Sequence, residues 1–124
     1  MNLYIADTHF GHSNVIRFDG RPFKDVDDTN AMKYFESDDK MMHVEDIYQG
    51  KRIQICMCHY PMLEWYRSFH GTWHIYGHIH NLRERTYEIM RDIDHALNAG
   101  ASVNNYAPAS FRELVENNKR FRES

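Results

Sequence analysis

Two pairs of residues in this chain have the types and the spacing needed to chelate a metal ion. Asp7 and His9 are separated by one residue and follow a short apolar segment near the N-terminus. His78 and His80 have the same spacing and follow a second apolar segment, which ends at Gly77. Because side chains two residues apart on an extended chain point the same way, each pair can direct both side chains toward one ion. The glycine lets the backbone turn sharply at the second pair.

A single histidine, His59, ends a third apolar segment and is followed by Tyr60 and Pro61, so the chain is expected to leave the sheet there. Three strand ends therefore each offer imidazole or carboxylate groups that a packed sheet would hold in place. This mixture of ligands suits Mn, Fe, Ni, Co or Zn better than Ca or Mg. Cys56 and Cys58 lie within the third segment, where we expect small buried hydrophobic residues rather than metal ligands.

The candidate ligands need strands that end just before them, and the hydrophobic pattern predicts such strands. Gly50 is expected in a hairpin turn at 49–51. Expected strands lie at 3–6, 41–48, 52–59, 72–76 and 96–103.

The clearest pattern for a helix is at the C-terminal end. Ser110 and Glu113 form a capping-box pattern before a terminal helix. One side of that helix is lined by Phe111, Leu114, Val115 and Phe121. Weaker patterns predict a helical turn at 14–18, a helix at 25–35, and either a helix or a strand at 83–94.

Composition limits the classes of partner. The 124 residues carry a formal net charge of −3 and a pI near 6.3, so no basic surface is expected to recruit a polyanion. The length and composition predict a single domain over 1–124. Neither a leader-like pattern nor an apolar stretch of membrane-spanning length occurs, and we therefore expect a cytoplasmic protein with no membrane partner. Ordinary surface or half-buried positions are expected for His43, His74 and His95.

The order of the motifs resembles that of the calcineurin-like metallophosphoesterase superfamily. The run DTHFGHSNVIR begins at Asp7, the run CHYPM contains His59, and the run FHGTWHIYGHIHN contains His78 and His80. These runs are similar to those of the small bacterial and phage branch of that superfamily. The similarity covers nearly the whole chain outside 31–40.

The resemblance implies a fold and a metal site. The fold would be an α/β structure, a four-layer α/β/β/α sandwich, and the site would hold two divalent metal ions. Asp7, His9 and His80 would bind one metal, and His59 and His78 would bind the other.

The resemblance also implies a reaction. The chain would be a hydrolase of phosphomonoesters or phosphodiesters, and its partner would be a small phosphate ester or a nucleotide. His12 and Arg17 follow the first pair of ligands in the sequence. We expect them to line the substrate entrance and to contact phosphate, the alternative being that they only order the loop.

Two motifs of that superfamily do not occur in this sequence. One is a Gly-Asp whose carboxylate bridges the two metals. The other is a Gly-Asn-His followed by Asp or Glu, which supplies a metal ligand and the catalytic histidine. In the order of the motifs, both would fall near residues 31–40, so we expect an internal segment to be missing there. The catalytic residue of this chain therefore stays unassigned.

Three interpretations follow. The chain is an active phosphoesterase whose printed sequence omits an internal stretch, which is favoured because two buried parallel strands are hard to delete from a sheet. Alternatively, it is an inactive, internally deleted relic that binds metal weakly through the same ligands. The third interpretation is a nucleic-acid-binding domain, against which the acidic net charge argues. It would use Arg17, Arg21, Arg83, Arg85 and the aromatic loop at 65–69.

Overall fold

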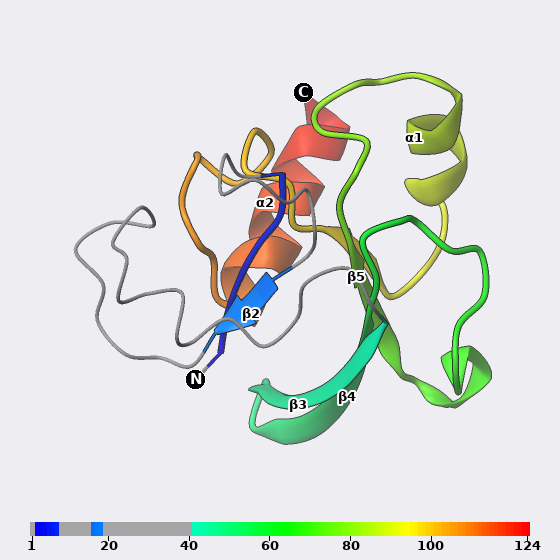
Figure 1. The fold of residues 1–124 in the computed structure, drawn as a ribbon, viewed down its shortest axis with the longest axis vertical. Helices are drawn as coiled ribbons and strands as arrows, with labels where there is room; N and C mark the ends of the chain where they lie inside the picture. Colours follow the sequence, from blue (N-terminus) through cyan, green and yellow to red (C-terminus); the bar gives the residue numbers. More distant parts are fainter. Residues whose placement is uncertain (1, 8–15, 19–40) are drawn as a thin grey trace.

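The computed structural model of the chain describes residues 2–7, 16–18 and 41–124 (Figure 1). Within these residues the fold is mixed α/β, with one four-stranded mixed sheet, a two-stranded sheet and two α-helices. The helix expected at 25–35 and the missing segment expected near 31–40 lie outside the described residues, as do His9 and His12.

The larger sheet has the strand order β3-β4-β5-β6. Antiparallel pairing joins β3 to β4, whereas β4, β5 and β6 run parallel to one another. The carboxyl ends of β4, β5 and β6 therefore meet at one edge of the sheet, which is the arrangement that can gather ligands from separate segments. The four strands are β3 (Met42–Tyr48), β4 (Lys51–Met57), β5 (Trp73–Tyr76) and β6 (Ala96–Asn98).

The expected hairpin at the start of this sheet is confirmed, with a tighter turn. Lys51 pairs with Tyr48, so only two residues form the turn. These are Gln49 and Gly50, with φ of 53° and 77°. Two left-handed residues match the twist of an antiparallel pair, which is why a glycine is favoured there.

The N-terminal strand β1 (Leu3–Ile5) pairs antiparallel with β2 (Ile16–Phe18). The helical turn expected at 14–18 is therefore wrong for its last three residues. An extended partner strand satisfies the backbone groups of β1, and a local sequence pattern does not reveal such a pairing. A parallel bridge between Ala6 and Gly100 also connects the end of β1 to the segment after β6.

The segment expected as a strand at 96–103 ends early, at Asn98. The residues after Asn98 leave β6 and form hydrogen bonds with the end of β1 instead. The Ala6 amide donates to the Ala99 carbonyl at 2.9 Å, and the Ala101 amide donates to the Ala6 carbonyl at 3.0 Å. These two bonds fix the backbone position from which Asp7 projects.

Helices α1 (Arg85–Met90) and α2 (Phe111–Glu123) and the short 3-10 helix η2 (Ser68–His70) complete the described elements. Of the region 83–94, expected as either helix or strand, only Arg85–Met90 forms a helix. The predicted capping box of α2 is confirmed, because the Glu113 amide donates to Ser110 Oγ at 3.2 Å and the Ser110 amide donates to Glu113 Oε1 at 2.9 Å. No helix among the described residues combines the length and the hydropathy needed to cross a membrane.

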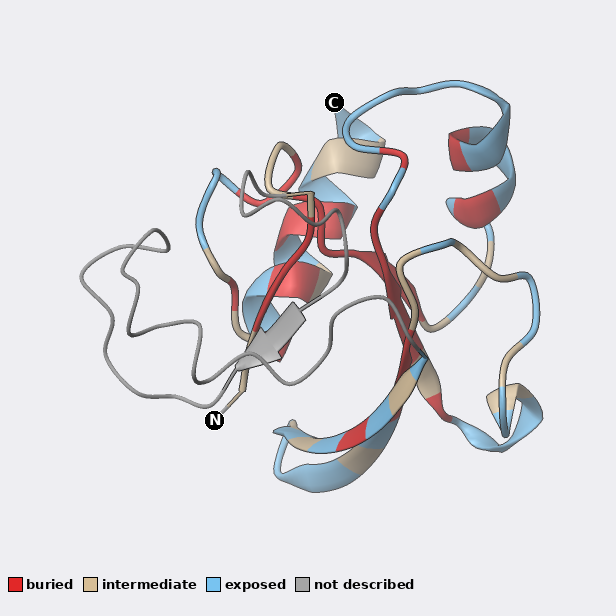
Figure 2. Cartoon of the chain, in the orientation of Figure 1, coloured by how far each residue is buried: buried red, intermediate tan, exposed pale blue. Residues whose placement is uncertain are grey.

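Buried residues, which are red in Figure 2, form two clusters, and α2 packs against both. Phe111 and Leu114 of α2 belong to the cluster of the larger sheet and β1. Phe121, near the other end of α2, packs against the cluster that contains Tyr87 and Met90 of α1.

His74 lies inside this core with no exposed surface, so the expectation of a surface or half-buried position is wrong for it. Its Nδ1 lies 2.9 Å from the Cys56 carbonyl, and its Nε2 accepts from the Met62 amide at 3.1 Å. The neutral tautomer that carries its proton on Nδ1 satisfies both contacts. Burial lowers the pKa of His74 to about 4, against a small opposing effect of the Cys56 carbonyl. His43 is exposed and His95 is half-buried, as expected.

Candidate metal site

Four of the five predicted ligands lie at one edge of the larger sheet. His59 follows β4, and His78 and His80 follow β5, which is parallel to β4. Asp7 follows β1, whose end is bridged in parallel to the segment after β6. The Gly77 amide donates to the His59 carbonyl at 2.9 Å, and this bond joins two of the segments.

The Asp7 carboxylate is the most enclosed group at this edge, with a side chain only 1% exposed. Its Oδ1 accepts from the His78 amide at 3.1 Å and lies 3.9 Å from Nε2 of His80. Its Oδ2 is buried and has no hydrogen-bond partner in the described part of the chain. A buried carboxylate oxygen without a partner is costly, and a bound cation is one group that would satisfy it.

Three of these residues have left-handed backbone conformations. The φ angles are 61° for Asp7, 73° for His78 and 53° for His80. Such angles are uncommon for residues other than glycine and cost about 1–3 kcal/mol each, so they persist only where surrounding contacts impose them. Their concentration at one edge indicates that the fold holds these side chains in set directions.

The His59 and His78 rings lie next to each other, with centroids 5.1 Å apart. Nδ1 of His59 is buried and has no hydrogen-bond partner among the described residues. Burial lowers the pKa of His59, the charge of Asp7 opposes this shift, and His78 and His80 add to it. The effect favours the neutral imidazole, which is the form that binds metal.

Gly77 and Gly100 leave the space that brings these segments together. A Cβ atom on Gly77 would lie 2.6 Å from the Cβ of Ala6, and one on Gly100 would lie 3.0 Å from Asp7 Oδ2. Both distances are too short for ordinary contacts. The glycines are therefore needed for close approach of β1, β5 and the segment after β6.

We expect Gly77→Ala to lower the free energy of unfolding by about 1–3 kcal/mol, because the added methyl group overpacks a rigid contact with Ala6. Urea denaturation measures the change. Adding Ala6→Gly should recover part of the loss in a double-mutant cycle, since it removes the opposing Cβ. Strict additivity of the two changes would contradict the steric explanation.

The described residues do not themselves form a complete metal site. Within residues 2–7, 16–18 and 41–124, no three His, Cys, Asp or Glu side chains are arranged to hold one ion. The structure instead provides two neighbouring pairs, Asp7 with His80 and His59 with His78. The predicted ligand His9 and the predicted phosphate contact His12 lie in the part that is not described, and the strand containing Arg17 is described for its backbone alone.

Both cysteines are free, and their positions agree with a structural role. Cys56 is fully buried, and Cys58 is half-buried. Burial, with a smaller effect of Cys58, raises the pKa of the Cys56 thiol to about 11, so Cys56 is a neutral thiol at pH 7.

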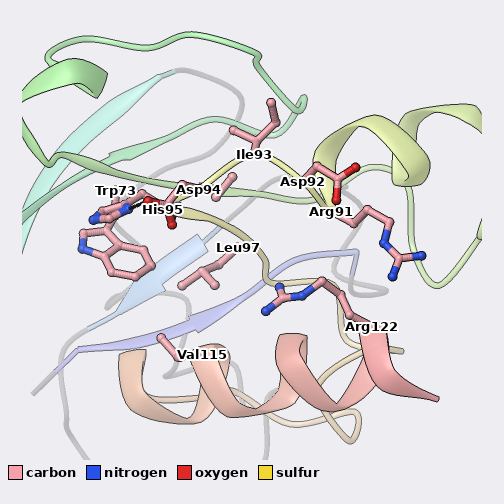
Figure 3. Close-up of a pocket in the computed structure, with 10 residues that line it drawn as sticks. Trp73, Arg91, Asp92, Ile93, Asp94, His95, Leu97, Val115 and Arg122 are labelled. Carbon is pink, nitrogen blue, oxygen red and sulfur yellow. Dashed lines mark hydrogen bonds and ion pairs between the residues drawn. The ribbon is translucent and has the colours of Figure 1, made fainter.

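A hollow of about 380 Å³ lies elsewhere, beside Trp73 and Ala96 at the beginnings of β5 and β6 (Figure 3). The candidate ligands lie at the opposite ends of these strands. Arg91 and Arg122 line this hollow together with Asp92 and Asp94, so charges of both signs surround it. The mixed lining favours no class of ligand over another.

Comparisons with models of protein families, with curated proteins and with solved structures found no match for this chain.

Two residues near the site were not singled out by the sequence pattern. Tyr60 is 60% exposed, and the centroid of its ring lies 4.8 Å from that of the His78 ring. The Asn98 side chain is buried and donates to the His80 carbonyl at 3.0 Å. Tyr60 directly follows the strand predicted at 52–59, and that position was the available signal; Asn98 lies inside the strand predicted at 96–103, which gave no signal for it.

Proposed function

We propose that this chain is a divalent-metal-dependent hydrolase of phosphate esters, related to the calcineurin-like metallophosphoesterases. One observation carries the proposal: a buried carboxylate with an unpartnered oxygen lies at the same sheet edge as three histidines from two parallel strands. The types of donor fit borderline divalent ions such as Mn, Fe, Ni, Co or Zn. The motif order DTH, CHYP and GHIH adds the link to phosphate-ester chemistry.

The side chains have distinct tasks in this proposal. Asp7 supplies the anionic ligand, and its direction is fixed by the His78 amide. His80 belongs with Asp7, with His9 as the third expected ligand, while His59 and His78 form the second pair. Bound divalent ions would offset phosphoryl charge and lower the pKa of the attacking water.

The proposed substrate is a small phosphate ester or a nucleotide. The negative net charge of the chain gives no reason to expect a polyanion. Arg83, one of the cations of the nucleic-acid alternative, already donates to the Phe121 carbonyl and lies 4.0 Å from the centroid of the Phe121 ring. These contacts favour a structural role for Arg83 and support the choice of a small substrate.

The four-layer α/β/β/α sandwich remains part of the proposal. The mixed sheet with α2 against it supports one half of such an arrangement. The second candidate function is an inactive metal-binding relic of the same fold. It is favoured by one specific observation, which is that the Gly-Asp and Gly-Asn-His motifs do not occur in the sequence.

Hydrolysis of p-nitrophenyl phosphate and of its diester, with added Mn²⁺, tests the proposal. We expect a rate that EDTA removes and that His80→Ala lowers by at least about tenfold, since one ligand of the Asp7 pair is lost. The matched control is His43→Ala, which removes an exposed histidine of β3 and should keep the rate. Mn²⁺ binding without any hydrolysis would favour the relic, and neither binding nor hydrolysis would reject both.

A further inference from the structure

Four asparagines form a buried cluster between β6 and α2. Their exposed fractions are 4% for Asn98, 2% for Asn104, 8% for Asn117 and 7% for Asn118. Asparagine is rarely buried, and each side chain here has hydrogen-bond partners. Such a cluster fixes relative positions more strictly than apolar packing does.

Asn98 is the member that reaches the candidate metal site. Its Nδ2 donates to the His80 carbonyl at 3.0 Å. Its Oδ1 accepts from the Gly100 amide at 2.7 Å. One side chain therefore connects the backbone of a candidate ligand to the glycine that lies against the Asp7 carboxylate.

The rest of the cluster holds Asn98 itself in place. The Asn98 amide donates to Asn118 Oδ1 at 2.8 Å. The Asn98 carbonyl accepts from Nδ2 of Asn104 at 2.9 Å and from Nδ2 of Asn118 at 3.0 Å. These bonds connect the site to α2, which carries Asn118.

His80 needs such support because it has a left-handed backbone, with φ of 53°. A histidine in this conformation relaxes to a commoner one unless neighbouring groups prevent it. The bond from Asn98 to the His80 carbonyl is a direct restraint on that peptide unit. Relaxation would rotate the imidazole away from Asp7, which now lies 3.9 Å from it.

We propose that Asn98 is a positioning residue that sets the separation of His80 and Asp7 in the candidate metal site. This inference rests on the proposed function, since it assumes that the two residues bind one ion. Groups that orient metal ligands typically change metal affinity by about 10–100-fold when they are lost.

Asn98→Ser is the sharpest variant. A serine hydroxyl can still accept from the amide two residues ahead, and thus keep the turn to Gly100, but it is too short to reach the His80 carbonyl. Titration with Co²⁺, followed by the absorption of the bound ion, should show binding at least about tenfold weaker than in the unchanged chain. The spectrum should also change in shape, because the ligand geometry changes.

Asn117→Ser is the matched control, since Asn117 is a buried asparagine of the same cluster whose side chain bonds to Asn104 and Arg120 rather than to Asn98 or His80. It should lower stability but leave Co²⁺ affinity unchanged under conditions in which the protein is folded. If Asn98→Ser does not fold, Asn98→Asp replaces it, because a carboxylate keeps the acceptor for Gly100 and cannot donate to His80. Weaker Co²⁺ binding in spite of the added negative charge would then support the proposal.

The outcomes separate the two proposals. Equal Co²⁺ affinity in the Asn98 variant and the unchanged chain, or equal losses in the Asn98 and Asn117 variants, would overturn the positioning role and leave the metal site standing. An unchanged chain that binds no Co²⁺ would overturn both.

Discussion

Replacing Asp7 by asparagine is expected to remove metal-dependent hydrolysis while making the metal-free protein more stable. The asparagine side chain has the same size as aspartate and keeps an oxygen that accepts from the His78 backbone amide. It loses the negative charge that binds a cation. Loss of several kcal/mol of electrostatic stabilisation corresponds to a rate on the order of a thousandfold lower. Initial rates with p-nitrophenyl phosphate and Mn²⁺ measure this loss.

The gain in stability has a separate cause. The Asp7 side chain is 1% exposed and its Oδ2 has no partner in the described structure, so folding without metal buries an incompletely satisfied carboxylate. A neutral amide costs less to bury, and asparagine tolerates a left-handed backbone. We expect urea denaturation in EDTA to show a gain of about 1 kcal/mol.

Asp46→Asn is the control for this substitution. Asp46 is also a partly buried carboxylate, but its oxygens accept from Tyr4 Oη at 2.7 Å and from the Ile47 amide at 2.7 Å. Removing its charge should weaken those bonds, lower stability and leave Mn²⁺ binding intact. Loss of stability in Asp7→Asn comparable to that in Asp46→Asn would show that Asp7 is a structural residue.

His74 is expected to make the protein sensitive to acid. Its pKa is lowered from 6.5 to about 4 in the fold, so between these values the unfolded chain binds a proton that the folded chain does not. The stability contributed by the neutral imidazole is therefore complete above pH 6.5 and is lost as the pH falls toward 4. The full loss is roughly 3 kcal/mol.

Denaturation by urea between pH 7.5 and pH 4, in EDTA, measures this effect. His74→Gln removes the titrating group, so the difference in free energy of unfolding between it and the unchanged chain should shrink as the pH falls. The control is His43→Gln, which removes an exposed imidazole from β3. A difference that stays constant across this range would show that His74 does not carry the acid sensitivity.

Local patterns predicted the parts of the fold that are specified by a few neighbouring residues. The β3-β4 hairpin follows from Gly50 between two alternating segments, and the start of α2 follows from Ser110 and Glu113. The candidate ligands were predicted for the same reason, because Asp7 and His78 each come directly after or close to a strand end.

Features that depend on distant partners were not predictable in this way. The pairing of Ile16 with Ile5 requires two segments to meet, and the early end of β6 requires the end of β1 beside it. The burial of His74 and Asn98 depends on carbonyl and amide groups from other strands and from α2, which satisfy their polar atoms. A polar residue in the sequence does not reveal such partners.

The position of α2 has a consequence for how the molecule melts. One helix contributes Phe111 and Leu114 to the first core cluster and packs Phe121 against the second. Local unfolding that begins at α1 would expose the last turn of α2 to solvent. Unfolding of that turn would then destabilise the rest of α2, which covers the sheet. The helix thus couples the two clusters into one cooperative unit, as do β5 and β6, which contribute buried residues to both.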